Sequence, residues 1–191
     1  MSTEKTELER MEVLRLSNIE SNRITKECIE SALILLMKER EYTAISITDI
    51  VKRAGVSRTA YYRNYSSKED ILHNMMQEVV DKVVAAMNLY APTENAYNFW
   101  YAMFHALNPY YETYQLLLKA NFGETILYEI NQKLLSEVSV ENIIERYTSN
   151  FWSGAVYSIL TEWIKNGRQQ TEEEMAHICC SILQTFAFQN E

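Results

Sequence analysis

Apolar residues recur every three or four positions along most of the chain, which is the spacing of amphipathic helices. The first such stripe begins at Ile24 and ends at Leu36, and it predicts a helix over about residues 22–39. Only 4 Gly and 2 Pro occur in 191 residues, so there is little material for the tight turns of a β fold. The pattern therefore predicts an all-α fold. Further helices are expected over about residues 46–54, 57–64, 66–83, 96–107, 111–120, 126–137, 141–166 and 171–186.

The second and third predicted helices are joined by a very short turn. Ser46 is followed three residues later by Asp49, a capping-box pattern that starts a helix. Gly55 ends that helix, because glycine adopts the left-handed backbone of a sharp turn without steric cost. Ser57 then caps a short helix rich in polar and aromatic residues. This order predicts a helix-turn-helix, whose second helix enters the major groove of DNA.

A second capping-box pattern, Ser66 with Glu69, predicts the start of a long helix directly after the helix-turn-helix. Lys68 lies in the first turn of that helix. Because backbone N–H groups and the positive end of the helix dipole meet there, a lysine at this point suits a phosphate group. We therefore expect Lys68 to contact the DNA backbone.

The charge of the chain at first opposes a role in DNA binding, since the net charge is −8. The distribution changes this picture. Residues 76–191 hold 6 basic and 14 acidic residues, whereas residues 38–68 hold 7 basic and 3 acidic ones. Positive charge is thus concentrated around the predicted helix-turn-helix, as phosphate contacts require.

Residues 50–69 carry a family resemblance. They read Ile-Val-Lys-Arg-Ala-Gly-Val-Ser-Arg-Thr-Ala-Tyr-Tyr-Arg-Asn-Tyr-Ser-Ser-Lys-Glu. This run resembles the signature of the tetracycline-repressor (TetR) family, Ile-Ala-x-x-Ala-Gly-Val-Ser-x-Gly-x-aromatic-Tyr-x-His-Phe-x-x-Lys-Glu. The match extends over roughly residues 20–75. It departs from the signature at Val51, Thr59, Asn64 and Tyr65, and Thr59 and Asn64 make the operator sequence harder to infer.

The resemblance implies a homodimer that binds a palindromic operator in double-stranded DNA, represses transcription and is released by a small-molecule effector. Arginine pairs with guanine, asparagine with adenine, and methyl groups touch thymine. Tyr61 and Tyr65 are interpreted as core aromatics. The residues implied to face bases or nearby phosphates are Arg58, Thr59, Ala60, Arg63 and Asn64. Those implied to hold the DNA backbone are Ser46, Thr48, Ser57, Tyr62 and Lys68.

The C-terminal half is acidic and rich in aromatic residues. Residues 159–167 and 171–174 resemble the Gram-positive TetR subgroup related to dihydroxyacetone-kinase operon regulators. Two long amphipathic helices at the end of a chain either complete a monomer core or pair with their copies. In this family they pair across a dimer and the helical core encloses an effector, although most of the rings are expected to be simple core. The candidates for the effector site are Trp100, Phe104, Tyr114 and Phe122. The candidates for the dimer interface are Phe151, Ala155, Ile159, Ile178 and Ile182.

These patterns divide the chain into an N-terminal extension (1–20), a helix-turn-helix domain (21–67) and a helical effector-binding and dimerisation domain (68–191). The role of residues 1–20 is left open. Neither a signal peptide nor an apolar run long enough to span a membrane occurs, and the 3 cysteines form no disulfide framework. We therefore expect a cytoplasmic protein.

Three other functions compete with this interpretation. An enzyme is disfavoured, because the sequence contains no phosphate-binding loop or zinc motif, and no cofactor or metal is expected. A redox sensor built on Cys179 and Cys180 is disfavoured, because adjacent cysteines form only a strained disulfide. A TetR-fold coactivator or protein-binding partner with an unused DNA surface stays open, because residues 1–75 have a net charge of zero.

Overall fold

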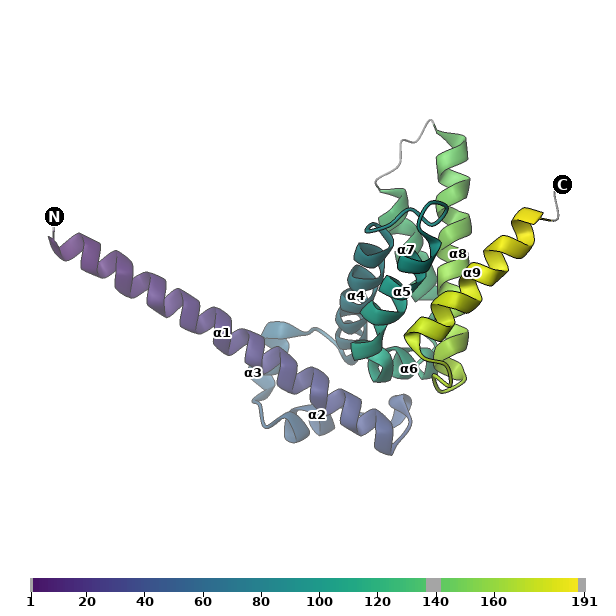
Figure 1. Ribbon diagram of the computed structural model, residues 1–191. Helices are drawn as coiled ribbons and strands as arrows, with labels where there is room; N and C mark the ends of the chain where they lie inside the picture. The colour runs from purple at the N-terminus through teal and green to yellow at the C-terminus, as the bar shows by residue number, and fades with distance from the viewer. Residues whose placement is uncertain (1, 137–141, 189–191) are drawn as a thin grey trace. The chain divides into compact units, whose positions relative to one another are not determined.

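The computed structural model describes residues 2–136 and 142–188, and every regular element in these two segments is a helix (Figure 1). The expected all-α fold is confirmed. The chain forms two compact units, Met1–His73 and Asn74–Glu191. In the described segments, no helix is long and apolar enough to cross a membrane.

The N-terminal unit is built on one long helix. α1 (Ser2–Glu39) packs against α2 (Ile47–Ala54) and α3 (Arg58–Asn64), and a 3-10 turn, η1 (Tyr42–Ala44), joins α1 to α2. α4 (Lys68–Met87) starts in this unit and continues into the next. The small core is closed by side chains that are completely inaccessible to solvent, namely Ile29, Leu33, Ile50, Tyr61, Ile71 and Leu72.

α1 is continuous from Ser2, so the predicted start near Asn22 was wrong. Residues 2–39 contain neither proline nor glycine and are rich in Glu, Leu, Arg and Lys, which favour helix. Arg23 pairs with Glu20 and Glu27, both at 2.5 Å, and so ties the two parts of the helix together across the predicted boundary. The apolar stripe marked where α1 becomes buried and not where it begins.

The caps of the helices follow the sequence closely, with one exception. Thr171 and Glu174 form a capping box at the start of the last predicted helix, since Thr171 N–H donates to the carboxylate at 2.8 Å and Glu174 N–H donates to the hydroxyl at 3.2 Å. The predicted box of Ser66 with Glu69 was wrong. Asp70 N–H donates to Ser67 Oγ at 3.1 Å, while Asp70 accepts from Ser66 N–H at 2.9 Å. The carboxylate that closes this turn lies one residue later than predicted.

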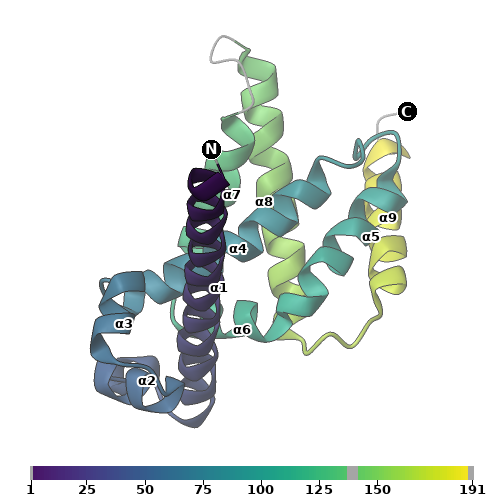
Figure 2. The same cartoon turned by 90° about the vertical axis from the view of Figure 1, so that its left-hand side faces the viewer.

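The C-terminal unit is a bundle in which α5 (Ala96–Leu107) lies along α9 (Glu172–Phe188), and α7 (Gly123–Leu135) packs against α8 (Ile143–Lys165) (Figure 2). The 3-10 turn η2 (Asn108–Tyr110) leads from α5 into α6 (Tyr111–Lys119). The predicted helices over 96–107 and 111–120 are confirmed. α7 begins three residues before the prediction, and the predicted ends at 137 and 141 lie outside the described residues.

Candidate nucleic-acid interface

The turn between α2 and α3 has the geometry that the sequence predicts. Gly55 adopts φ 67° and ψ 24°, a left-handed conformation in which a side chain is strained. Val56 N–H donates to Val51 O at 3.2 Å and closes the end of α2. Ser57 then caps α3, because its Oγ accepts from Ala60 N–H at 3.0 Å. The chain thus changes direction within three residues and presents α3 as a separate short helix.

The start of α2 is fixed by a complete capping box. Asp49 N–H donates to Ser46 Oγ at 3.2 Å, and Ser46 N–H donates to the Asp49 carboxylate at 2.9 Å. The hydrogen bonds from Ser46, helped by Arg40 at 3.1 Å, lower the pKa of Asp49 to about 2. The Asp49 carboxylate therefore stays ionised in its capping box below the ordinary pKa of 3.8.

α3 has one buried and one exposed side. Tyr61 is 0% and Tyr65 2% exposed, which confirms their interpretation as core aromatics. Tyr62 is 54% exposed, and its ring meets that of Tyr61 edge-on at 5.2 Å between centroids. α3 is therefore packed against the core through these two buried tyrosines, and its polar side faces solvent. The exposed residues on this helix are Arg58, Thr59, Tyr62 and Arg63.

The two predicted DNA-binding arginines differ in their contacts with the rest of the protein. Arg58 donates to Thr48 Oγ1 at 2.6 Å, so it connects α3 to the start of α2. Arg63 is exposed and makes no hydrogen bond or ion pair with any described residue. All of its guanidinium donors are therefore available to a ligand.

Ala60 and Asn64 lie half-buried on the side of α3 that faces α1. Asn64 Nδ2 donates to Ala60 O at 2.8 Å, and Asn64 Oδ1 is buried without a hydrogen-bond partner among the described residues. The amide is thus occupied by its own helix. Its predicted contact with a base requires this side chain to turn outward.

Lys68 has a structural partner in place of a phosphate. Its ammonium group donates to Tyr42 O and Ile45 O, both at 3.0 Å, and lies 4.4 Å from the centroid of the Tyr42 ring. The hydroxyl of Tyr42 donates to Glu69 at 2.9 Å. Lys68 therefore holds η1 against the start of α4, and one of its three donors is left for phosphate. Ser46 and Ser57, also predicted to hold the DNA backbone, are exposed, and their hydroxyls are engaged as helix caps.

The C-terminal unit contains a cluster of aromatic rings between α5 and α8. The ring centroid of Trp100 lies 6.3 Å from that of Phe104 and 6.4 Å from that of Trp152. The centroids of Phe104 and Trp163 are 5.0 Å apart. Trp100 and Phe104 are 2% and 0% exposed. Trp163 Nε1 donates to Gln170 O at 3.0 Å, whereas Trp100 Nε1 is buried without a partner among the described residues. Such a group carries a desolvation cost that a ligand with an acceptor atom would remove.

The other two predicted effector residues lie apart from these rings. Tyr114 is 1% exposed on α6, and its hydroxyl shares a hydrogen bond of 2.8 Å with Thr161 Oγ1. Phe122 precedes α7, is half-buried and makes no ring contact within the described segments. The structure thus brings Trp100 and Phe104 together and leaves Tyr114 and Phe122 outside their cluster. Trp152 was missed, because it lies next to Phe151 on a helix whose apolar stripe was assigned to the dimer.

Two family models match this chain. One describes "Bacterial regulatory proteins, tetR family" and matches residues 30–75. The other describes "Transcriptional regulator C-terminal region" and matches residues 94–185. Together they cover most of the sequence and both units. The chain belongs to the TetR family of bacterial transcription regulators.

Individual relatives agree with this family. The chain is 30% identical over 67 residues to the uncharacterized HTH-type transcriptional regulator YxbF of Bacillus subtilis (strain 168). That match covers 32% of this chain and only 18% of YxbF. The solved structure of the dihydroxyacetone kinase operon activator DhaS is similar with a TM-score of 0.52 and 17% sequence identity, over 86% of this chain and 95% of that one. The predicted resemblance to that subgroup is therefore confirmed for the fold.

The TetR chain also exposes apolar side chains on its last two helices. On α8, Phe151 is 63% exposed, while Ala155 and Ile159 are half-buried. On α9, Ile178 and Ile182 are 43% and 42% exposed. The same stripe continues into the first turns of α8, beyond the predicted interface residues. The additional exposed residues there are Ile143 (65%), Ile144 (79%) and Tyr147 (74%).

Proposed function

We propose that this TetR-family regulator binds a palindromic operator as a homodimer, with α3 in the major groove. The observation that carries the proposal is the polar side of α3, above all Arg63, which is exposed and has no partner among the described residues. Each bidentate contact of a side chain with a base contributes about 1–3 kcal/mol of discrimination. Because a helix of seven residues reaches few bases, two copies are needed to select one site in a genome.

The apolar side chains of α8 and α9 supply the surface for the second copy. Ile144, Tyr147 and Phe151 are spaced three and four residues apart, so they form one stripe along α8. Monomers rarely expose a continuous stripe of large apolar side chains. In a dimer these groups leave water, and the two α3 helices acquire a fixed spacing.

Release of the operator is assigned to an effector that binds in the aromatic cluster of α5 and α8. Flat or cationic apolar molecules suit such rings, and the unpartnered Trp100 Nε1 favours a molecule with a hydrogen-bond acceptor. An effector that binds the DNA-incompetent state roughly 100-fold better weakens operator binding by about 2.7 kcal/mol. We propose that the protein acts in the cytoplasm as a repressor and without catalytic activity.

The DNA-reading proposal is tested by selecting genomic fragments with the purified full-length protein at fixed salt. Wild type is compared with Arg63→Ala and with Arg23→Ala, which removes the same charge from an exposed arginine on α1 that is already paired with two glutamates. We expect wild type and Arg23→Ala to enrich one palindromic sequence and Arg63→Ala to lose it. If no protein enriches any sequence, direct DNA reading fails, and the alternative of a coactivator with an unused DNA surface takes its place.

The dimer is tested separately by light scattering after chromatography. Phe151→Glu is expected to give a monomer, because it places a charge in the apolar stripe of α8. Tyr128→Glu is the matched control, since Tyr128 is 59% exposed on α7 and lies outside that stripe. A dimer that survives Phe151→Glu would show that the copies meet through another surface.

A further inference from the structure

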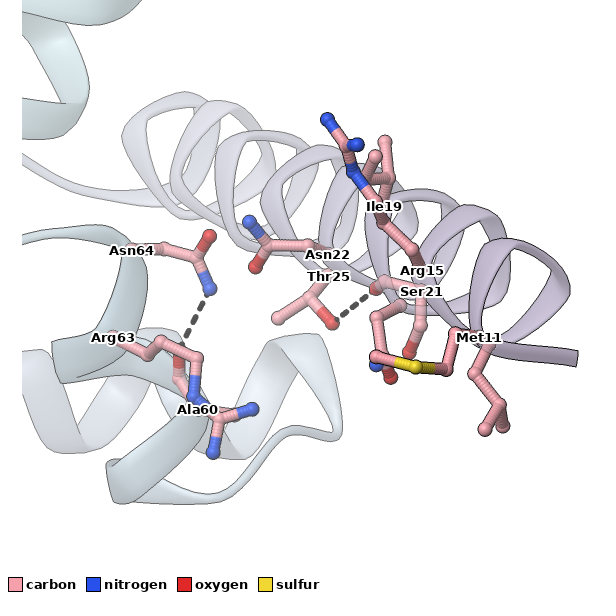
Figure 3. Close-up of a pocket in the computed structure, with 11 residues that line it drawn as sticks. Met11, Arg15, Ile19, Ser21, Asn22, Thr25, Ala60, Arg63 and Asn64 are labelled. Atoms are coloured by element: carbon pink, nitrogen blue, oxygen red, sulfur yellow. Dashed lines mark hydrogen bonds between the residues drawn. The ribbon is translucent and has the colours of Figure 1, made fainter. Parts of the chain in front are cut away.

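A groove of about 700 Å³ lies between the N-terminal part of α1 and the recognition helix α3 (Figure 3). Asn22 and Thr25 of α1 face Arg63 and Asn64 of α3 across it. Three residues of α3 that are predicted to approach DNA line this groove, namely Ala60, Arg63 and Asn64. The groove is therefore a continuation of the candidate DNA interface and not a separate pocket.

The charged side chains that line the groove are all basic. Its lining contains Arg15 and Arg63 and, among the described residues, no aspartate or glutamate. Glu20 and Glu27, by contrast, lie away from the groove and are held by Arg23. The lining thus carries two positive charges, Arg15 on α1 and Arg63 on α3, although α1 is rich in glutamate.

The neutral side chains of the lining suit a nucleic-acid backbone. Asn18 and Asn22 carry amide N–H donors of the kind that phosphate and sugar oxygens accept, whereas the Thr25 hydroxyl already donates to Ser21 O at 2.8 Å. Met11 and Leu14 offer apolar surface beside them. A phosphate chain with intervening deoxyribose rings presents both kinds of surface.

A second copy of α1 fits this region less well. Leu14 and Leu16 are 56% and 60% exposed, but two positions along a helix are about 200° apart, so these side chains point in nearly opposite directions. Leu14 lines the groove and Leu16 does not. A coiled coil requires one continuous apolar seam, which α1 lacks over this stretch.

We propose that the groove face of α1, from Met11 to Thr25, is a second DNA-binding surface, on which Arg15 and Asn18 hold the phosphate backbone beside the site read by α3. The inference rests on the proposed function of α3. At a rise of 1.5 Å per residue this face is about 21 Å long, which corresponds to about six base pairs along the duplex. The operator that this protein protects is therefore longer than the sequence that α3 reads.

The test measures the operator affinity of full-length protein over a range of salt concentrations. Each lost phosphate contact lowers the slope of log affinity against log salt by about 0.9. Arg15→Ala is expected to lower the slope by about two per dimer and to leave the preference for operator over random DNA unchanged. Arg15→Lys should keep the slope, and the matched control Arg23→Ala should resemble wild type.

Operator length gives an independent readout. Removing about six flanking base pairs from each end should weaken wild type and leave Arg15→Ala nearly unaffected, because the variant has already lost that contact. If Arg15→Ala keeps the wild-type slope and flank dependence while Arg63→Ala loses operator preference, the α1 proposal fails and the function of α3 stands. A change in oligomeric state without a change in slope would assign the groove to a second copy and overturn the proposal.

Discussion

The candidate functional side chains are exposed in the N-terminal unit and buried in the C-terminal one. Arg58, Thr59 and Arg63 project from a short helix that stands on the buried rings of Tyr61 and Tyr65. The C-terminal unit reverses this order. Its candidate effector residues Trp100, Phe104 and Tyr114 are themselves the core. In the N-terminal unit, buried residues hold the candidate DNA-binding residues in place. In the C-terminal unit, the candidate effector residues are themselves the buried core residues.

This difference affects how each unit tolerates change. Substitutions of the exposed residues on α3 are expected to leave the fold intact, so the proposed operator preference should change separately from stability. A substitution in the aromatic cluster is expected to change stability together with the proposed effector binding.

The largest effect is expected from Trp100→Ala. Removing a buried tryptophan leaves a cavity and should lower the free energy of unfolding by about 3–5 kcal/mol. Trp100→Phe should cost much less, because Trp100 Nε1 has no partner among the described residues and no hydrogen bond is lost. Urea unfolding of the full-length protein measures both. A loss below about 1 kcal/mol for Trp100→Ala would mean that the ring is not part of a packed core.

A smaller effect is expected from Gly55→Ala in the other unit. A non-glycine residue at φ 67° costs about 1–2 kcal/mol, although a Cβ at this point meets no neighbouring atom. The midpoint temperature of thermal unfolding and the affinity for the operator should both fall. Gly55→Asn should recover part of the loss, since asparagine tolerates the left-handed region. Equal stability of wild type and Gly55→Ala would show that the turn relaxes without the left-handed residue.

Each unit contains a buried tyrosine, and the two tyrosines differ in whether their hydroxyl has a hydrogen-bond partner among the described residues. Tyr114→Phe should destabilise by about 1–2 kcal/mol, because it breaks the bond to Thr161 and leaves that hydroxyl unpaired. Tyr61→Phe should be neutral or slightly stabilising, since the Tyr61 hydroxyl is buried without a partner among the described residues. Parallel urea titrations compare them. A greater loss for Tyr61→Phe would reveal a partner, such as an ordered water, at that hydroxyl.

The smallest effect concerns the cap of α2. Because the pKa of Asp49 is lowered from 3.8 to about 2, the ionised carboxylate stabilises the folded state. This contribution is complete above about pH 4 and is lost as the pH falls through about 2. Carboxyl NMR should find the titration midpoint near 2 in wild type and closer to 3.8 in Ser46→Ala. The same midpoint in both proteins would rule out the capping box as the cause.

The sequence predicts structure best where the signal is local. Caps such as Ser46 with Asp49, and turns such as Gly55, depend on neighbours within five residues, and they are confirmed. The start of α1 was missed, because residues 2–21 carry no apolar stripe as regular as the one from Ile24 to Leu36. The cap of α4 was misplaced by one residue, since both Glu69 and Asp70 follow serines at suitable spacing.

Contacts between distant segments were harder to foresee. The position of Trp152 beside Trp100 depends on how α8 packs on α5, about 50 residues away, and no periodicity encodes this. The contacts of Lys68 with the carbonyls of Tyr42 and Ile45 were likewise unforeseen, since the sequence does not place these segments near one another. The groove between α1 and α3 was not predicted either, because it forms only if the helix of α1 continues through residues 11–21. The DNA-binding and effector residues themselves stay predictions.

The central claim, that α3 reads base edges, is tested most directly by substituting each base pair of the selected operator in turn. Affinities of wild type, Arg63→Ala and the control Arg23→Ala are measured for every substituted duplex at one salt concentration. We predict that Arg63→Ala loses about 1–3 kcal/mol of discrimination at one position in each half-site and keeps discrimination at the others. Uniform weakening at all positions, with discrimination unchanged, would contradict the claim and assign Arg63 to the phosphate backbone.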